Sequence, residues 1–360
     1  MRRLTRFVAA LVAALACTLV ALSGLAESVP SAGGSLRVLW RADAGRSIEQ
    51  PPLVDARAVY VVTTDPRTMA FDRASGEKLW STRAKQPFSA PPLLAGGRVV
   101  VGLGGRAPRV RALECSDGEE AWTVAVSSEP RHLLQDGDGL LVLLHSGELR
   151  RLALADGSTL WRRPGLGTRP AGMALGDSVL FVLARKDSVL ALAARGGTEV
   201  WHAIEPGFYA ASPALLGGEL ALLAGDGREV YLDPASGARL GGARRSPLQL
   251  APPVLSGGFV VSQCTGGRVE AVDRSERATI WSVDLNAAAA GGVVASDGLL
   301  FCLSRAGRLA ALRADRGGLI WKLDLGTRFF VPPLVRPDLL LLAGERGELI
   351  VYARESEGRP

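Results

Sequence analysis

The spacing of tryptophan is the feature that most constrains what this chain can fold into. The seven tryptophans are Trp40, Trp80, Trp122, Trp161, Trp201, Trp281 and Trp321. Their successive gaps are 40, 42, 39, 40, 80 and 40 residues, and the doubled gap places a missing member near Gly241. A recurrence close to 40 residues along the whole chain indicates a repeat array rather than two or three unrelated domains.

The text around each tryptophan recurs in the same register. Residues 74–80 read ASGEKLW, residues 116–122 SDGEEAW and residues 155–161 ADGSTLW, and the phrase decays to ASGARLG at 235–241. A second phrase precedes each tryptophan: PPLV at 51–54, PPLL at 91–94, SPAL at 212–215, PPVL at 252–255 and PPLV at 332–335, with degenerate copies at 131–134, 171–174 and 291–294. Together the two phrases define eight units.

Each unit has the pattern of a four-stranded antiparallel meander. The proline-led run predicts a short strand, because proline is tolerated at the first residue of a strand. Gly-Gly or Asp-Gly then supplies the positive φ of a tight hairpin turn, as at 96–97 and 297–298. An apolar run such as 58–62 needs cover on both faces, an alternating strand such as 268–273 follows, and the tryptophan lies in the fourth strand.

Sheets that are apolar on both faces must stack on each other in a ring or a row. Repeats of ~40 residues with four strands are typical of β-propellers. We therefore predict an all-β, eight-bladed β-propeller of four-stranded blades over residues 36–353. One tryptophan per blade at a constant register favours a structural role, in which the side chain docks one blade on the next and its N–H reaches a backbone carbonyl. A ligand-stacking role is the less favoured alternative.

The two ends of the repeat array predict how the ring closes. The eighth unit provides three strands, the last of them at 348–352, and it lacks a tryptophan. Residues 36–40, LRVLW, have the pattern of a fourth strand without a blade of its own. We therefore expect the N-terminal strand to complete the last blade, which removes a free sheet edge. Residues 27–35 are then a linker and 354–360 a C-terminal tail.

The first 26 residues predict export. Three arginines precede an uncharged stretch over residues 7–26. Gly24 and Ala26 suit a signal-peptidase site, so residues 1–26 are expected to be a cleaved signal peptide. Two alternatives stay open: a retained signal anchor, because 20 apolar residues can span a bilayer, and lipidation at Cys17. All three place the rest of the chain in the periplasm or on the periplasmic side of a bacterial membrane.

Charge and metal-binding residues exclude several functions. Removing the three leading arginines lowers the formal net charge from +6 to +3, so the high pI gives no support for nucleic-acid binding. The remaining cysteines, Cys115, Cys264 and Cys302, have neither CxxC spacing nor an even number, and whether two of them pair stays open. His132 and His145 fall at the same end of the third unit, but a zinc site needs a further ligand nearby.

The phrase around each tryptophan, at its period near 40 residues, resembles the pyrroloquinoline-quinone (PQQ) repeat family over about 36–353. The resemblance implies the propeller fold, which hosts both quinoprotein dehydrogenases and non-catalytic scaffolds. The dehydrogenases bind quinone and calcium, use an adjacent cysteine pair and carry long insertions between blades. This sequence has no adjacent cysteine pair, no CxxCH haem motif and units of only 39 to 42 residues. We therefore expect no catalytic residue, no cofactor and no metal site, and a quinoprotein dehydrogenase is the least favoured function.

Eight short blades behind an export signal resemble the BamB-type scaffolds of outer-membrane protein assembly. This resemblance implies a non-catalytic, monomeric propeller that binds protein partners in the cell envelope, with an outer-membrane assembly complex as the leading candidate. It implies no nucleic acid, and membrane contact only through a lipid or signal anchor. The alternative is a periplasmic propeller that binds carbohydrate or another ligand, and a small ligand in the central channel stays open.

The candidate binding surface lies on the segments that lead from each tryptophan strand into the next proline-led strand. These connector segments share one face of the ring with the loops after the second strands, and they carry large side chains of the kind that interfaces enrich. The candidates for partner binding are Phe88, Arg131, Arg169, Phe208, Tyr209, Arg244, Arg245, Arg328, Phe329 and Phe330. The alternative is that Phe88, Phe208 and Phe329 or Phe330 plug the central channel.

Overall fold

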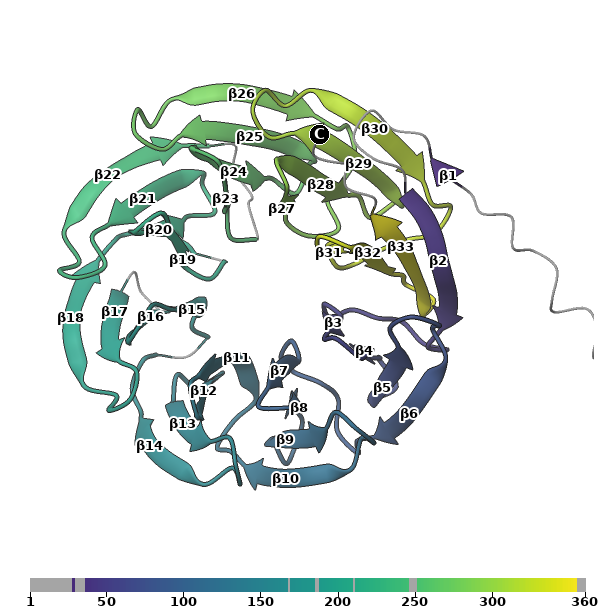
Figure 1. Ribbon diagram of the computed structural model, residues 1–360. Coiled ribbons are helices and arrows are strands. Elements are labelled where there is room, and N and C mark those ends of the chain that lie inside the picture. The colour runs from purple at the N-terminus through teal and green to yellow at the C-terminus, as the bar shows by residue number, and fades with distance from the viewer. Residues whose placement is uncertain are drawn as a thin grey trace, which may run out of the picture.

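The computed structural model describes residues 28–29, 36–167, 169–184, 188–209, 211–245 and 251–354. They form strands β1 to β33, which are arranged as eight antiparallel sheets around a ring (Figure 1). The predicted all-β, eight-bladed propeller is confirmed. The predicted signal segment 1–26, including Cys17, lies outside the described residues, as do residues 355–360. No helix long and apolar enough to cross a membrane occurs in the described part of the chain.

Blades 1 to 4 follow the order of the chain. Blade 1 consists of β3 (Leu53–Val54), β4 (Ala58–Val62), β5 (Arg67–Asp72) and β6 (Lys78–Arg83). Blade 2 consists of β7 (Leu93–Ala95), β8 (Arg98–Leu103), β9 (Arg109–Glu114) and β10 (Glu120–Ala125). Blade 3 consists of β11 (Pro130–Asp136), β12 (Gly139–Leu144), β13 (Leu149–Ala153) and β14 (Thr159–Arg163). Blade 4 consists of β15 (Gly172–Leu175), β16 (Val179–Leu183), β17 (Ser188–Ala193) and β18 (Glu199–Ile204).

Blades 5 to 8 continue the ring. Blade 5 consists of β19 (Ala214–Leu216), β20 (Glu219–Leu223), β21 (Arg228–Leu232) and β22 (Arg239–Arg244). Blade 6 consists of β23 (Val254–Ser256), β24 (Phe259–Gln263), β25 (Arg268–Asp273) and β26 (Thr279–Asp284). Blade 7 consists of β27 (Val294–Ser296), β28 (Leu299–Leu303), β29 (Arg308–Arg313) and β30 (Leu319–Asp324). Blade 8 consists of β31 (Leu334–Val335), β32 (Leu339–Ala343), β33 (Glu348–Arg354), β2 (Leu36–Asp43) and β1 (Ser28–Val29).

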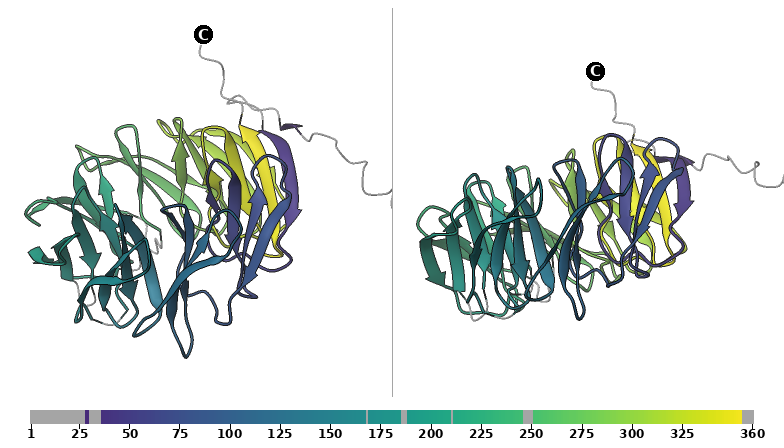
Figure 2. Two further views of the ribbon diagram at one scale, coloured as in Figure 1. Left: turned by 60° about the horizontal axis from the view of Figure 1, so that its bottom comes forward. Right: turned by 90° about the horizontal axis from the view of Figure 1, so that it is seen from below.

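The first strand of each blade lies innermost and the fourth strand outermost, except in blade 8, where β1 lies outside β2 (Figure 1). Seen from the side, the strands run between two faces on which the loops gather (Figure 2). The tight turns between first and second strands have the backbone that their glycines predict, since Gly96 and Gly97, like Gly217 and Gly218, both have positive φ.

Closure by the N-terminal strand is also confirmed. β2 pairs antiparallel with β33, with Leu36 opposite Arg354 and Trp40 opposite Val351. The range 27–35, which we expected to be a linker, contains the two-residue strand β1 at the outer edge of this sheet.

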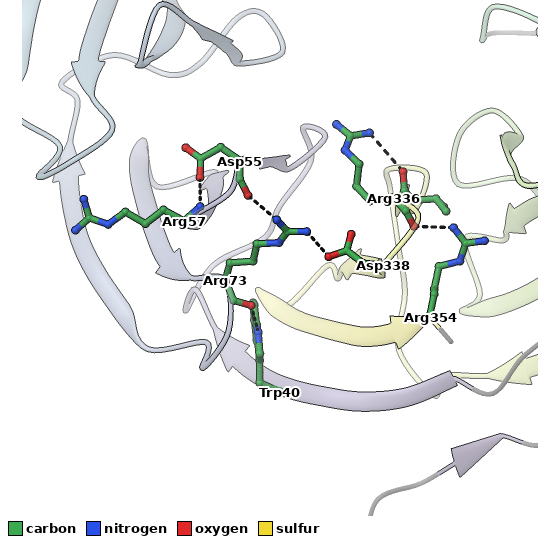
Figure 3. A network of polar contacts seen from close by, with 8 residues as sticks. Trp40, Asp55, Arg57, Arg73, Arg336, Asp338 and Arg354 are labelled. Carbon is green, nitrogen blue, oxygen red and sulfur yellow. Dashed lines mark hydrogen bonds and ion pairs between the residues drawn. The ribbon is translucent and has the colours of Figure 1, made fainter. Parts of the chain in front are cut away.

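Polar contacts join blade 8 to its neighbour blade 1 (Figure 3). Trp40 Nε1 donates to the carbonyl of Arg73 at 2.8 Å. The Arg73 guanidinium in turn donates to the Asp55 carbonyl of blade 1 at 3.2 Å and to the Asp338 carboxylate of blade 8 at 2.5 Å. One arginine therefore holds both sides of the junction at which the two ends of the array meet.

The buried core is divided into eight clusters, one for each interface between consecutive blades. We call these interfaces seams and name them by the blades that they join. Alternate residues of the second strand point to opposite seams: Leu140 and Val142 of β12 pack in seam 2/3, whereas Leu141 and Leu143 pack in seam 3/4. Because fully burying one such side chain stabilises by about 1.5–3 kcal/mol, a blade gains most of its stability from its two neighbours.

Six tryptophans bridge their seams in the same way. The indole N–H donates across the seam to a backbone carbonyl of the next blade at 2.8 to 3.2 Å: Trp40 to Arg73, Trp80 to Cys115, Trp122 to Leu154, Trp161 to Ala194, Trp201 to Pro234 and Trp281 to Ala314. A register shift of one residue immediately before each tryptophan turns the side chain toward the seam, as at Trp80, which pairs with Ala70.

The glycine of the recurrent phrase is the partner of the preceding tryptophan. Gly118 has a φ of +75°, and a Cβ on it would lie 2.5 Å from Trp80 Cε3. Gly76, Gly157, Gly197 and Gly317 are packed against an indole in the same manner. The glycine is thus required twice, once by its backbone conformation and once by the ring that lies on it.

Seam 5/6 departs from this arrangement. Blade 5 has Gly241 in place of the tryptophan, and Gly241 pairs with Tyr231. Arg277 replaces the turn glycine with a φ of +58°, and its guanidinium lies 3.7 Å from the centroid of the Tyr231 ring. The same guanidinium donates to both carboxylate oxygens of Glu219 at 2.7 and 2.8 Å. A tyrosine stacked on an arginine therefore fills the space of the missing indole.

The prediction that Arg245 lies on the binding surface is wrong, because its side chain is buried in seam 5/6. It forms an ion pair with Glu229 at 2.7 Å in which both side chains are fully buried. Its guanidinium also donates to the carbonyls of Val260 at 3.1 Å and Glu270 at 3.4 Å. Among the described residues, this seam has only four buried hydrophobic residues, against eight to thirteen in the others, so a charged pair occupies space that is apolar elsewhere.

We expect Gly118→Ala to destabilise the fold by about 3 kcal/mol, which combines the strain of a left-handed alanine with crowding against Trp80. Gly97→Ala is the matched control, because Gly97 has the same φ of +75° but no atom within 4 Å of the added Cβ. The control should lose only about 1 kcal/mol. Urea unfolding of both variants measures the difference, and equal losses would show that the indole contact contributes nothing.

We expect Arg245→Ala to destabilise the fold by about 3–5 kcal/mol, because it leaves the Glu229 carboxylate buried without its counter-charge. Arg244→Ala, a change at the exposed neighbour, should stay within about 0.5 kcal/mol of the parent. Replacing both partners by Glu229→Leu and Arg245→Met should restore most of the loss, since apolar pairs commonly match buried ion pairs in stability. Chemical unfolding of the three variants tests this, and a double variant as unstable as Arg245→Ala would contradict it.

Candidate functional site

The connector face is the face of the ring that carries the connector segments. Four of these segments form a single β-bridge at the end of the second strand of the following blade. The bridged pairs are Phe88 with Leu103, Tyr209 with Ala224, Ala289 with Ser304, and Phe329 with Gly344. A residue at a bridge is held against the end of the second strand, so its side chain is directed into the protein. The residues beside it alternate outward, as in any extended chain.

This alternation separates the ten predicted binding residues. Five are exposed: Arg131, Arg169, Phe208, Arg244 and Arg328. Phe88 and Phe330 are half-buried, Phe88 against the cluster of seam 1/2 and Phe330 with the Arg328 guanidinium 5.7 Å from its ring centroid. The remaining three are buried, namely Tyr209, Arg245 and Phe329.

The placement of Tyr209 and Phe329 on the surface is wrong for the same physical reason. Both are bridge residues, and they belong to the clusters of seam 4/5 and seam 7/8. Phe329 is fully buried between blades, so it fills a seam rather than the central channel. Their role is to pack the start of one blade against the previous one.

Phe208 stands out at the surface. It is 74% exposed, the highest fraction among the exposed large hydrophobic residues. Its ring lies next to Gly225, where an added Cβ would be 2.9 Å from Phe208 Cδ1. Ile204, at the end of β18, is 67% exposed. The sequence analysis did not name Ile204, because exposed apolar residues also occur on other outer strands, as at Val200 and Ile280, so one such residue does not mark a site.

Two cationic side chains of blade 5 lie near the connector that carries Phe208. Arg228 and Arg244 are opposite each other on β21 and β22, and both lie at the end of blade 5 that adjoins Gly207 and Phe208. Arg228 is partly neutralised by Asp226 at 2.8 Å, whereas Arg244 is exposed. We name Ile204, Phe208, Arg228 and Arg244 the connector patch. An exposed aromatic side chain beside arginines is the composition of protein-binding hot spots.

The two histidines of blade 3 give no support for metal chemistry. Burial, with a smaller effect of Arg131, lowers the pKa of His132 to about 4, so this side chain is neutral at physiological pH. Within the described ranges, no group of three or more His, Cys, Asp or Glu residues is placed to bind a metal ion. Cys264 and Cys302 are buried and Cys115 is half-buried, and none of these three is in a disulfide in the structure.

Most of the chain matches one protein family. The profile of the family described as "Outer membrane protein assembly factor BamB" matches residues 32–169, 145–261 and 265–359. A BamB from Bordetella pertussis is 28% identical over 134 residues, which are 35% of this chain and 33% of that protein. A BamB from Kangiella koreensis is 51% identical over 45 residues, 12% of this chain and 11% of that protein. The aligned stretches thus span a third or less of these relatives.

Solved structures share the ring at low sequence identity. BamB from Moraxella catarrhalis superposes with a TM-score of 0.76 at 17% identity, covering 88% of this chain and 99% of that one. Quinohemoprotein alcohol dehydrogenase from Comamonas testosteroni gives a TM-score of 0.70 at 13% identity, covering 90% and 77%. At these identities the likeness shows the fold alone, which enzymes and scaffolds share. The family profile covers nearly the whole repeat array: this chain belongs to the family of the outer membrane protein assembly factor BamB.

Proposed function

We propose that this protein is an exported, non-catalytic scaffold that binds a protein partner of outer-membrane protein assembly through the connector patch. Membership of the BamB family supports the process. The connector patch supports the place, because Phe208 is the most exposed large apolar side chain among the described residues and two arginines lie at the adjoining end of blade 5. This patch is the observation that carries the proposal.

The remaining exposed candidates extend the surface. Arg131, Arg169 and Arg328 are exposed on or beside other connector segments, so the face carries cations over several blades. Arginine forms bidentate bonds with carboxylates and stacks on aromatic rings, which suits it to a polar interface rim around an apolar centre. We infer that the partner presents acidic side chains around an apolar contact with Phe208.

A scaffold role also accords with the compactness of the blades. The tight Gly-Gly and Asp-Gly turns of the opposite face offer few large side chains, as at 96–97 and 297–298. The sequence has no adjacent cysteine pair and no long insertion of the kind that resemblance to the dehydrogenases would require. A propeller of this form provides a rigid platform, and specificity then depends on the side chains of one face.

The test is crosslinking in cells of the full-length protein and of a Phe208→Ala/Arg244→Glu variant. We expect the parent to capture a component of the outer-membrane protein assembly machinery and the variant to lose at least tenfold of that capture, because both changes remove contacts central to the patch. Thermal unfolding of the variant should match the parent, since both side chains are exposed.

Arg316→Glu is the control, because Arg316 is exposed in a turn of the opposite face and carries the same charge change. It should capture as the parent does. Capture that contains no assembly component would contradict the proposed process. Equal capture by the double variant and the control would contradict the proposed surface.

A further inference from the structure

A hollow of about 680 Å³ opens between blades 6 and 7. Its floor includes Gln263, Cys302 and Ala310, and its walls include Val283 and Leu323 from the outer strands β26 and β30. It lies toward the connector face, where these two strands end. Its volume is within the range of sites that bind small molecules and short peptides.

Three side chains explain why this seam is open. Seam 4/5 is filled at the corresponding strand positions by Leu183, Leu222 and Val230, and seam 7/8 by Leu303, Leu342 and Ile350. Seam 6/7 has Gln263, Cys302 and Ala310 there. Two of these are smaller than their counterparts and the third is polar, so the seam lacks the aliphatic volume that closes seams 4/5 and 7/8.

Gln263 is the polar exception in its register. By strand pairing, its counterparts in the other seven blades carry no polar side chain: Val62, Gly102, Leu143, Leu183, Leu223, Leu303 and Ala343. Gln263 is 5% exposed, and no described residue donates a hydrogen bond to its Oε1. A buried amide oxygen without a partner is unfavourable, so this side chain is suited to a ligand that enters the hollow and pairs with it.

The rim of the hollow carries available cations. Lys322 and Arg308 line it, and neither makes an ion pair with a residue that the structure describes. The same rim carries two carboxylates, each of which accepts one backbone amide: Asp284 from Asn286 at 2.8 Å and Asp324 from Gly326 at 3.1 Å. Lys322 and Arg308 are therefore the charged side chains at the mouth without a polar partner among the described residues, and they can bind an anionic group of a ligand.

We propose that this hollow binds a short extended peptide segment that places an aliphatic side chain between blades 6 and 7 and an acidic group against Lys322 and Arg308. The peptide backbone carries both an N–H donor and a carbonyl acceptor, so it satisfies the Gln263 amide. A fatty acid offers the chain and the carboxylate but no donor for that amide. The apolar walls suit the aliphatic residue of the peptide, and Lys322 and Arg308 suit the acidic one.

The hollow is separate from the connector patch, which lies at blades 4 and 5. Binding in the hollow goes beyond the proposed scaffold role and is measured with purified protein and synthetic peptide. Failure here would leave the cellular capture through Phe208 unchanged, and failure of that capture would leave peptide binding in the hollow unchanged.

The experiment measures fluorescence anisotropy of a labelled tetrapeptide, Leu-Glu-Leu-Asp, with the purified protein. We expect saturable binding that weakens at least tenfold for the uncharged peptide Leu-Gln-Leu-Asn. The Cys302→Leu/Ala310→Ile variant introduces the residues of seam 7/8 and should lose binding while its thermal stability is kept or raised. Lys322→Ala should weaken binding at least fivefold without affecting the fold.

Arg162→Ala is the matched control, because Arg162 directly follows Trp161 on blade 3 as Lys322 follows Trp321 on blade 7. It should bind as the parent does. No saturable binding, undiminished binding by the filled variant or by Lys322→Ala, or equal affinity for the uncharged peptide would overturn the proposal. Full displacement of the peptide by decanoate at a lower concentration than by unlabelled peptide would assign the site to fatty acids instead. If the filled variant does not fold, Gln263→Leu replaces it with the same expectation.

Discussion

Stacking of one blade on the next is the constraint on which the rest of the structure depends. The second strands of the blades are buried on both faces, so an isolated blade would expose the apolar surface that its neighbours now cover. At the outer part of a seam, the indole of one blade packs on the turn glycine of the next. The ring needs a flat surface without a Cβ, and the glycine provides it. The recurrent phrase of the sequence is therefore required by a contact between neighbouring blades and not by contacts within one blade.

Seam 5/6 shows that the tryptophan–glycine contact can be replaced by a different group of residues. Gly241, Tyr231 and Arg277 depart from the pattern together, and the structure brings the latter two into stacking distance. The inner part of the seam is exchanged as well, with Arg245 and Glu229 in an apolar position. Both sides of blade 6 are thus unusual: one seam is filled by charged side chains, and the other is left open as a hollow. The connector patch lies beside the first of these seams.

The tryptophan spacing allowed the number of blades, the strands of each blade and the closing strand to be predicted, because all three follow from a periodic pattern. The exposure of individual side chains was harder to predict. Tyr209 and Phe208 are consecutive, yet one is buried and the other is the most exposed large apolar residue of the described ranges, since a single bridge to Ala224 sets the alternation. Arg244 and Arg245 differ in the same way. Surface composition cannot place such residues without the register of the connector.

Gln263 and Glu229 could have been noticed from sequence, because each is polar in a register that is aliphatic in most units. The sequence could not show what each polar residue contacts, because this depends on the side chains that the next blade places opposite it. Glu229 meets Arg245, whereas Gln263 faces Cys302 and Ala310, and the same kind of substitution gives an ion pair in one seam and an open space in the next.

The pairing of β2 with β33 has a consequence for the order in which the molecule is made. β2 is synthesised before every complete blade, and its partner strand is synthesised after all the others. During synthesis the edge of β2 that pairs with β33 therefore stays unpaired, and blade 8 cannot form until the final repeat has emerged. Completion of the ring is a late event that joins the oldest and youngest parts of the chain, so a polypeptide interrupted anywhere before β33 lacks the strand that closes it.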